Sequence, residues 1–297
     1  MKELAKKIII GSWSFSGNLG NTNIKDSHEA IIHAIENNLN KFDTAPVYGD
    51  GNVDKLLSIY KKKIIINTKC GYTLDGKKKT FAESDIKYSL EKSLDMFDKI
   101  NILYLHNPRN EIKNWDKVIN LLNDFKKKKL INYTGISVAR DFYFDKDILG
   151  EFDYIQDDMN LLRTSYLPIL KGIKKKIVAR SPLATGILTN KFNFKTKFSK
   201  NDYRNSWCKG ERFKNILHQV KELKKIFPKN ENIAEFAQLY ILQNKNIDLV
   251  NFGIKSKEQV KSLMKLTKKK KISQKVLIKL KHLIKNNYNL AKNKELY

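Results

Sequence analysis

Four side chains with acid–base chemistry lie at or just beyond the ends of three successive apolar segments. Asp43 follows the apolar part of KFDT, Lys69 ends KIIINTK, His106 ends INILYLH, and Tyr48 lies five residues after Asp43. A buried Asp, Lys or His needs polar partners, so these positions are hard to explain as core. Taken singly, His106 or Tyr48 would more often be structural. As a set, the four residues predict a catalytic group whose members are partners for one another.

The chemistry of this group follows from ordinary pKa values. Reduction of a carbonyl by hydride needs a proton donor at the developing alkoxide, and a tyrosine with a pKa of about 10 is a poor acid near neutrality. Lys69 can lower the pKa of Tyr48 by charge proximity, and Asp43 can hold Lys69 by an ion pair. His106 can hydrogen-bond the substrate oxygen. Such chemistry requires no metal.

Segments rich in Ile, Val, Leu, Phe and Tyr alternate with segments of helical period. Strands are expected at 8–12, 41–44, 63–69, 100–106, 132–137, 152–156, 176–181 and 248–253. Helices are expected at 26–38, 86–97, 115–125, 164–173, 213–227, 231–244 and 256–266, with a last one at 276–284 packed on the outside. The first helix is expected to open with Asp26 and Glu29 as a capping box and to place Ile31, Ile32, Ile35 and Leu39 on one face.

This alternation predicts parallel strands joined by right-handed crossovers. The glycine fingerprint of an open dinucleotide-binding sheet, GxGxxG, is absent from GSWSFSGNLG after the first strand. Eight strands instead fit a closed (β/α)8 TIM barrel. We therefore expect one α/β barrel domain over residues 1–297.

The net charge of +27 over 297 residues invites a nucleic-acid interpretation. However, the lysine runs 61–63, 126–129 and 174–176 stand immediately before strand segments. That position is the N-terminal face of a barrel, whereas barrel active sites lie at the other face. We expect these runs to be solvated surface and the chain to have no nucleic-acid partner.

Other features narrow the class of protein further. No apolar stretch approaches the roughly 18 residues of a membrane span, and the N-terminal apolar segment is too short for a secretory signal. Cys70 and Cys208 form no CxxC pair, and the five histidines form no zinc pattern. We expect a cytoplasmic enzyme without a metal or a membrane partner. Trp207 and Cys208 are equally compatible with a substrate loop and with a loop anchor.

The segments FDTAPVYGDG, INTKCG and LYLHNP together resemble the signature of the aldo-keto reductase family. GSW, YTGISV, YIQDDMNLL, SPLATGILTNKF and FGIKSKEQ resemble further strands and loops of that family, and IVARS resembles its short bacterial members. The resemblance implies the barrel, NADPH (NADP) as cofactor, Tyr48 as general acid, and a small carbonyl substrate. It also hints at a sugar or sugar derivative.

The resemblance further implies which residues bind the cofactor. At the nicotinamide these are Ser12 and Trp13 beside the ring, Ser137 and Gln156 at the carboxamide, and Arg180 beneath or beside the ring. Along the pyrophosphate they are Ser181, Pro182, Leu183, Gly186 and Leu188, with Lys191 reaching the phosphates. Asp43 and Gly253 complete the set.

The start of the last barrel helix adds a physical argument. Lys255, Ser256 and Gln259 open this helix, and helix N-terminal amides with nearby lysines suit an adenosine 2′-phosphate. Ser256 and Gln259 can at the same time form a capping box. This favours NADP over NAD. Ser262 and Leu263 stand where many family members carry an acid-amide pair that contacts adenine, so adenine contacts are expected to be weaker.

One alternative function stays open. Proteins of this fold also act as non-catalytic, NADP-binding regulatory subunits of ion channels. There the histidine position resembles an asparagine, whereas this chain has His106. The sequence leaves open whether the chain is a monomer or a homo-oligomer.

Overall fold

The computed structural model describes residues 2–73, 76–138, 145–163, 170, 172–227 and 232–287. Eight parallel strands pair in chain order, and the last pairs with the first, which closes a barrel. They are β1 (Ile8–Gly11), β2 (Lys41–Asp43), β3 (Ile65–Cys70), β4 (Ile100–His106), β5 (Ile131–Ser137), β6 (Tyr154–Asp158), β7 (Lys176–Arg180) and β8 (Leu249–Gly253). The predicted barrel is confirmed.

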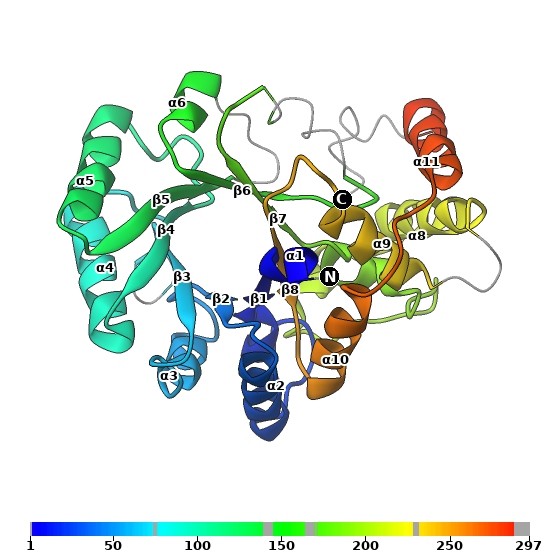
Figure 1. The fold of residues 1–297 in the computed structure, drawn as a ribbon, viewed down its shortest axis with the longest axis horizontal. Helices are drawn as coiled ribbons and strands as arrows, with labels where there is room; N and C mark the ends of the chain where they lie inside the picture. Colours follow the sequence, from blue (N-terminus) through cyan, green and yellow to red (C-terminus); the bar gives the residue numbers. More distant parts are fainter. Residues whose placement is uncertain are drawn as a thin grey trace.

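Helices surround the strands (Figure 1). They are α1 (Lys2–Lys6), α2 (Ile24–Glu36), α3 (Asn52–Ser58), α4 (Glu83–Phe97), α5 (Trp115–Lys127), α6 (Lys146–Gly150), α8 (Gly210–Lys224), α9 (Ile233–Leu242), α10 (Lys257–Leu266) and α11 (Gln274–Asn287). Three 3-10 helices follow strands or loops: η1 (Ser12–Ser16), η2 (Ala184–Thr189) and η3 (Tyr203–Ser206). The expected helix at 164–173 lies mostly outside the described residues. The expected C-terminal helix is α11, on the outside beside α8 (Figure 1).

The first barrel helix begins earlier than predicted. Asn23, in an extended conformation, accepts a hydrogen bond from the amide of Lys25 at 2.9 Å and so caps α2. Asp26 therefore lies in the first turn, where its charge complements the helix dipole, and does not cap the helix. The expected apolar face was also partly wrong, because Ile31 is buried but Ile32 is 44% exposed.

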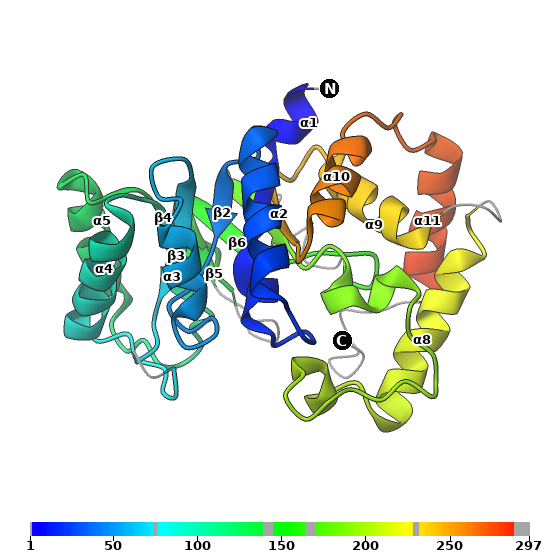
Figure 2. The ribbon, with the colours of Figure 1, turned by 90° about the horizontal axis from the view of Figure 1, so that it is seen from below.

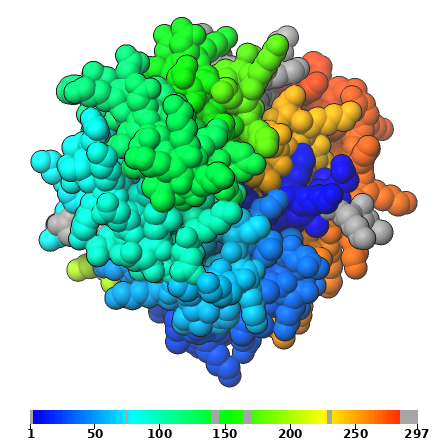
Figure 3. All heavy atoms as spheres, turned by 60° about the vertical axis from the view of Figure 1, so that its left-hand side comes forward, coloured from blue at the N-terminus to red at the C-terminus, as the bar shows by residue number. Residues whose placement is uncertain are grey.

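The N-terminal helix α1 lies at the end of the barrel where the strands begin. Figure 2 shows α1 at the opposite end of the molecule from the segment between η2 and α8. Leu4 and Ala5 pack against the core, and Lys7 donates hydrogen bonds to the carbonyls of Asn244 and Ile247, at 3.0 and 2.5 Å. In Figure 3 the N-terminal segment, in dark blue, lies at the surface between lighter blue and orange segments. These contacts place α1 over the end opposite the loops that follow the strands.

Lysine runs lie at the same end of the barrel as α1. The run 61–63 connects α3 to β3, and the run 126–129 connects α5 to β5. Several of these lysines pair with acids: Lys61 and Lys62 lie 2.7 and 2.9 Å from the carboxylate of Asp98. Much of the positive charge is therefore remote from the C-terminal ends of the strands.

Alternation along the strands divides the barrel interior into an apolar and a polar layer. The apolar layer contains Ile9, Ile102, Tyr104, Tyr154 and Val178, with Leu249 packed against it. Two positions further along five of the strands are Gly11, His106, Gln156, Arg180 and Asn251. Inside the barrel the apolar layer is thus followed by a mostly polar layer at or near the C-terminal ends of the strands, and this layer forms the floor of the site.

Gly135 of β5 makes room for a ring of the apolar layer. A Cβ at this position would lie 2.4 Å from Cδ1 of Tyr104, its partner in register on β4. We expect Gly135→Ala to destabilise the fold by about 1 to 3 kcal/mol, the usual cost of overpacking a core, measured by urea unfolding. Gly150→Ala is the control, because nothing lies within 4 Å of its Cβ. Equal unfolding midpoints for the two variants would contradict this explanation.

Candidate active site

The four predicted side chains come together at the C-terminal rim of the barrel. Lys69 donates hydrogen bonds to Oδ1 of Asp43 and, at 2.7 Å, to the carbonyl of Thr44. The Lys69 Nζ lies 5.0 Å from the centre of the Tyr48 ring. The rings of Tyr48 and His106 meet edge to face with centres 6.2 Å apart. The expectation that these residues are partners for one another is met in their geometry.

The ionisation of Tyr48 differs from the expectation. Burial raises the pKa of Tyr48 above its ordinary value of 10.0, whereas the charge and hydrogen bond of Lys69 lower it by less. From the sequence we expected Lys69 to lower the pKa of Tyr48, but burial, the largest effect, raises it. Tyr48 is therefore a neutral phenol near neutral pH, which is the protonation state of a proton donor.

Lys69 and His106 are held in opposite charge states. Burial alone would lower the pKa of Lys69, but the charges of Asp43 and Tyr48 and their hydrogen bonds outweigh it, so the pKa is raised and Lys69 is a cation. Burial, together with the positive charges of Lys69, Arg180 and others, holds the pKa of His106 well below 6.5. The His106 imidazole is neutral and can donate one hydrogen bond.

Gln156 and Ser137 form a buried hydrogen-bond chain behind Asp43. The Gln156 amide donates to Oδ2 of Asp43 at 2.8 Å, and the Ser137 hydroxyl donates to Oε1 of Gln156 at 3.0 Å. Gln156 also lines the cavity described below, but Ser137 does not. The short Ser137 side chain lies behind Arg180, which donates to it at 2.5 Å.

Arg180 is fixed by partners from several strands and loops. Its guanidinium donates to Asp158 at 3.1 Å, to the Asn107 side chain at 2.9 Å and to the Val138 carbonyl at 2.9 Å, besides Ser137. Planar guanidinium groups with several partners are held in one orientation. Arg180 thus presents a fixed positive charge at the wall of the cavity.

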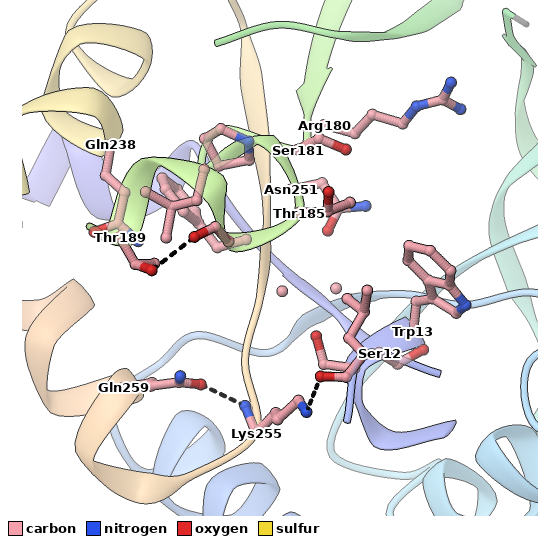
Figure 4. Close-up of a pocket in the computed structure, with 18 of the residues that line it drawn as sticks. Ser12, Trp13, Arg180, Ser181, Thr185, Thr189, Gln238, Asn251, Lys255 and Gln259 are labelled. Carbon is pink, nitrogen blue, oxygen red and sulfur yellow. Dashed lines mark hydrogen bonds between the residues drawn. The ribbon is translucent and has the colours of Figure 1, made fainter. Parts of the chain in front are cut away.

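An elongated cavity of about 330 Å³ begins beside Tyr48 and Asp43. Figure 4 shows Trp13 and Arg180 toward one end and Gln238 and Gln259 toward the other. The expected cofactor residues that line it are Ser12, Trp13, Asp43, Gln156, Arg180, Ser181, Pro182, Leu183, Gly186, Lys191, Gly253, Lys255 and Gln259. The remaining expected residues, Ser137, Leu188 and Ser256, lie outside its lining.

Leu188 and Ser256 lie outside the cavity lining, each for a local reason. Leu188 is fully buried among apolar residues of η2, α8 and α9. Ser256 caps α10, because its hydroxyl accepts a hydrogen bond from the amide of Gln259 at 3.4 Å. The Gln259 side chain in turn accepts from the amide of Lys255 at 2.6 Å (Figure 4). The capping function of Ser256 is thus present, with Gln259 reaching one residue further back than in a capping box.

Lys255 reaches across the cavity to the loop after η1. Its ammonium donates to the carbonyls of Leu19 and Gly20, at 2.7 and 2.9 Å. Burial and the nearby charge of Arg204 lower the pKa of Lys255. The Lys255 ammonium, which was expected to contact a 2′-phosphate, is therefore already hydrogen-bonded to neutral carbonyl groups.

Arg204 is a lining residue that sequence reasoning missed. It pairs with Asp202 at 2.6 Å and donates to the Leu19 carbonyl at 2.8 Å. Its guanidinium also lies 5.2 and 4.8 Å from the ring centres of Phe192 and Phe198. Residues 190–209 show no clear periodicity, so the sequence carried no signal for this position.

Two further residues of the stretch 190–209, Trp207 and Cys208, are buried. Trp207 and Cys208 are 7% and 5% exposed, within an apolar cluster that includes Phe213 of α8 and Phe236 of α9. Burial raises the pKa of the Cys208 thiol to about 12. Both side chains anchor the loop and do not line the cavity.

Aromatic side chains surround the open side of Tyr48 and His106. The Trp13 and Tyr203 rings meet edge to face with centres 5.2 Å apart, and the Tyr72 and His106 rings do so at 5.1 Å. These side chains come from loops after different strands, as barrel sites generally do.

At its C-terminal rim the closed barrel thus brings together a protonated tyrosine, a buried lysine–aspartate pair and a neutral histidine beside an elongated cavity. A model of the aldo/keto reductase family matches residues 7–285. The chain belongs to the aldo/keto reductase family. It is therefore a member of a family of oxidoreductases that use NAD(P)H.

Individual relatives agree with this membership. The chain is 28% identical over 286 residues to the aldo-keto reductase YhdN of Bacillus subtilis (strain 168), across 89% of this chain and 85% of YhdN. It is 24% identical over 285 residues to a probable voltage-gated potassium channel subunit beta of Arabidopsis thaliana, across 86% and 85% of the two chains. The structure of glycerol dehydrogenase AKR11B4 from Gluconobacter oxydans superimposes with a TM-score of 0.79 at 21% identity, over 95% of this chain and 93% of that one.

The described part of the chain has neither a cluster of metal-binding side chains nor a membrane-spanning helix. Among residues 2–287, apart from the gaps given above, no group of three or more His, Cys, Asp or Glu side chains could hold a metal ion. Within the same residues no helix is both long enough and apolar enough to cross a membrane.

Proposed function

We propose that this chain is an NADPH-dependent reductase that converts a small aldehyde or ketone into an alcohol. The observation that carries the proposal is the neutral phenol of Tyr48, placed between the Lys69–Asp43 pair and His106 at the edge of the elongated cavity. Each of these groups matches one requirement of carbonyl reduction.

The proposed roles follow from the protonation states. When bound, a reduced nicotinamide supplies the hydride. Neutral His106 hydrogen-bonds the substrate oxygen and Tyr48 donates its phenolic proton to the developing alkoxide. Lys69 stabilises the phenolate that remains, and Asp43 keeps Lys69 charged and in place.

The lining of the cavity fits a dinucleotide. A Cβ at Gly11 would lie 2.2 Å from Oδ1 of Asn251, and a Cβ at Gly253 would lie 2.8 Å from Oγ of Ser14, so the glycines bring the backbone close to polar side chains of the lining. Lys191, Arg204 and Lys255 give the part of the cavity beyond Tyr48 a positive potential that suits phosphates.

NADPH is proposed over NADH because of the start of α10. Lys255 now donates to neutral carbonyls. A phosphate would offer it a charged acceptor, and charge-assisted hydrogen bonds are about twice as strong as neutral ones. The gain from this exchange supports a preference for the 2′-phosphate.

The aromatic opening supports a hydroxylated substrate such as a sugar derivative. Trp13 and Tyr203 offer apolar ring faces, and the neighbouring Lys79 and Asn107 offer polar groups, since Lys79 donates to the Asn107 carbonyl at 2.7 Å. An apolar wall with a few polar groups is typical of pockets that orient small ligands.

A non-catalytic nucleotide-binding subunit is the second candidate, favoured by the similarity to the plant potassium channel subunit. One experiment separates the two functions. The protein is mixed with a panel of aldehydes, ketones and sugars and with NADPH or NADH, and nicotinamide absorbance is followed. We expect turnover that is faster with NADPH. Tight NADPH binding without turnover on any carbonyl would refute the reductase and support the second candidate.

A further inference from the structure

A second carboxylate lies behind the catalytic group. Asp54 of α3 is 3% exposed and accepts a hydrogen bond from the hydroxyl of Thr44. Within the described residues it has no ion-pair partner, although a buried carboxylate is costly without one. Asp54 is thus a buried acid whose side-chain hydrogen bond leads directly to the residue after Asp43.

Thr44 connects this carboxylate to Lys69. The residue is fully buried. Its hydroxyl donates to Asp54, its amide donates to the Asn67 carbonyl at 2.9 Å, and its own carbonyl accepts from Lys69 at 2.7 Å. The orientation of the Thr44 peptide is therefore fixed at three points, one of which is Asp54.

The Thr44 carbonyl determines where Lys69 directs its protons. An ammonium group has three N–H donors. Two of the Lys69 donors bond to the Asp43 carboxylate and to the Thr44 carbonyl. A hydrogen bond from Lys69 also acts on the Tyr48 phenol and lowers its pKa. A change in the Thr44 peptide would release one donor and let the ammonium turn away from the phenol.

Helix α3 is well placed to transmit this constraint. It packs against η1, and the Ser12 hydroxyl of η1 donates to the Asp43 carbonyl at 2.9 Å. The two successive carbonyls of Asp43 and Thr44 are thus held by Ser12 and Lys69, while Asp54 holds the Thr44 side chain.

We infer that Asp54 is a positioning residue for the reaction, acting through Thr44 to hold Lys69 on the phenol of Tyr48. The inference rests on the proposed reductase function for its kinetic test, but not for its spectroscopic one. It assigns a role to a residue of α3 that touches neither the cavity nor the proton that is transferred.

The positioning role of Asp54 should also depend on pH, because it depends on the charge of the carboxyl group. Burial raises the pKa of Asp54 to about 6, although the hydrogen bond from Thr44 and the charge of Lys69 oppose this. Lys69 of β3 is the charged side chain that acts on it, and Asp43 of β2 pairs with that same lysine. Of the helices packed against α3, η1 contains no titratable residue, and those of α4 are exposed apart from the half-buried Asp85, which accepts a hydrogen bond from Thr80. Near neutral pH the carboxylate is ionised and is the stronger acceptor for the Thr44 hydroxyl. Below pH 6 it is neutral and holds Thr44 less firmly.

The test compares Thr44→Val, which removes the hydroxyl at nearly constant volume, with Thr44→Ser, which keeps it. We expect Thr44→Val to lower kcat by about 10-fold, part of the 100- to 10,000-fold contribution of a general acid, with unchanged Kd for NADPH. Thr44→Ser should restore most of the loss. We expect kcat of the wild type to fall as the pH drops through about 6, where Asp54 becomes neutral, and Asp54→Asn to abolish this fall. Lys55→Ala, an exposed change on the same helix, is the control.

The second readout is carbon-13 NMR of labelled tyrosine in the whole protein, with Tyr48→Phe to assign the signal. The Tyr48 signal should shift in Thr44→Val and Asp54→Asn but not in Thr44→Ser or Lys55→Ala. Unchanged signals, or equal losses of kcat in Thr44→Val and Thr44→Ser, would overturn the inference. If the wild type turns over no carbonyl, the proposed function fails, yet the NMR comparison still decides the role of Asp54.

Discussion

Tyr48→Phe is expected to lower kcat for carbonyl reduction by about 100- to 10,000-fold, the usual contribution of a positioned general acid. The substitution removes only the phenolic oxygen, so the ring contacts with Trp13 and His106 remain. The Lys69–Asp43 pair is also kept, because it does not depend on the phenol. NADPH affinity should therefore stay unchanged while the chemical step fails, which single-turnover kinetics and fluorescence titration of NADPH would measure.

Tyr72→Phe is the matched control for this prediction. The Tyr72 ring also meets His106, with centres 5.1 Å apart, but the Lys69 ammonium does not act on its pKa. We expect its kcat to resemble that of the wild type. If Tyr48→Phe kept full activity, or if both variants lost activity equally, Tyr48 would not be the proton donor.

The positions of the four rim residues could be predicted because Asp43, Lys69 and His106 lie at or next to the ends of apolar strands and Tyr48 lies on the loop after the first of them. In a barrel of parallel strands, all such ends meet at one face, whatever the distances along the chain. Their charge states could not be predicted in the same way. The pKa of Tyr48 depends on how deeply the loop after β2 is buried, and that depth is a property of the packed structure.

Asn251 was missed although the sequence contained its signal. It is a polar residue at an inward position of β8, between the apolar Leu249 and Gly253, and it lines the cavity. Its side chain is half-buried and, within the described residues, makes no side-chain hydrogen bond to the protein. A polar residue inside an otherwise apolar strand was the signal, but only strand ends were considered as candidates.

Other lining residues carried no such signal. Arg204 comes from η3 and Gln238 from α9, and both line the cavity although neither belongs to a strand of the barrel. Ser137 lies outside the cavity lining for a different reason. Its strand was predicted, but its hydroxyl accepts a hydrogen bond from Arg180, a side chain from two strands further along.

Lys69→Met is expected to have the largest effect on stability. It would leave the Asp43 carboxylate buried without its cation, and breaking a buried pair in this way costs about 3 to 5 kcal/mol. Gln156 would still donate to Asp43 but cannot neutralise its charge. Urea unfolding of the variant and the wild type at neutral pH would measure the loss, and reductase activity should disappear with it.

The double variant Lys69→Met with Asp43→Asn separates stability from chemistry. Neither side chain is then charged, so the cost of an unpaired buried charge is removed, and replacing a buried ion pair by neutral groups is often nearly neutral for stability. We expect the double variant to unfold at a higher urea concentration than Lys69→Met alone, yet to remain inactive, because no cation stabilises the Tyr48 phenolate. If the two losses of stability simply added, the pair would not be coupled as its geometry requires. Recovery of stability without recovery of activity would show that the Lys69 charge is needed for the proton transfer and that the fold tolerates its absence.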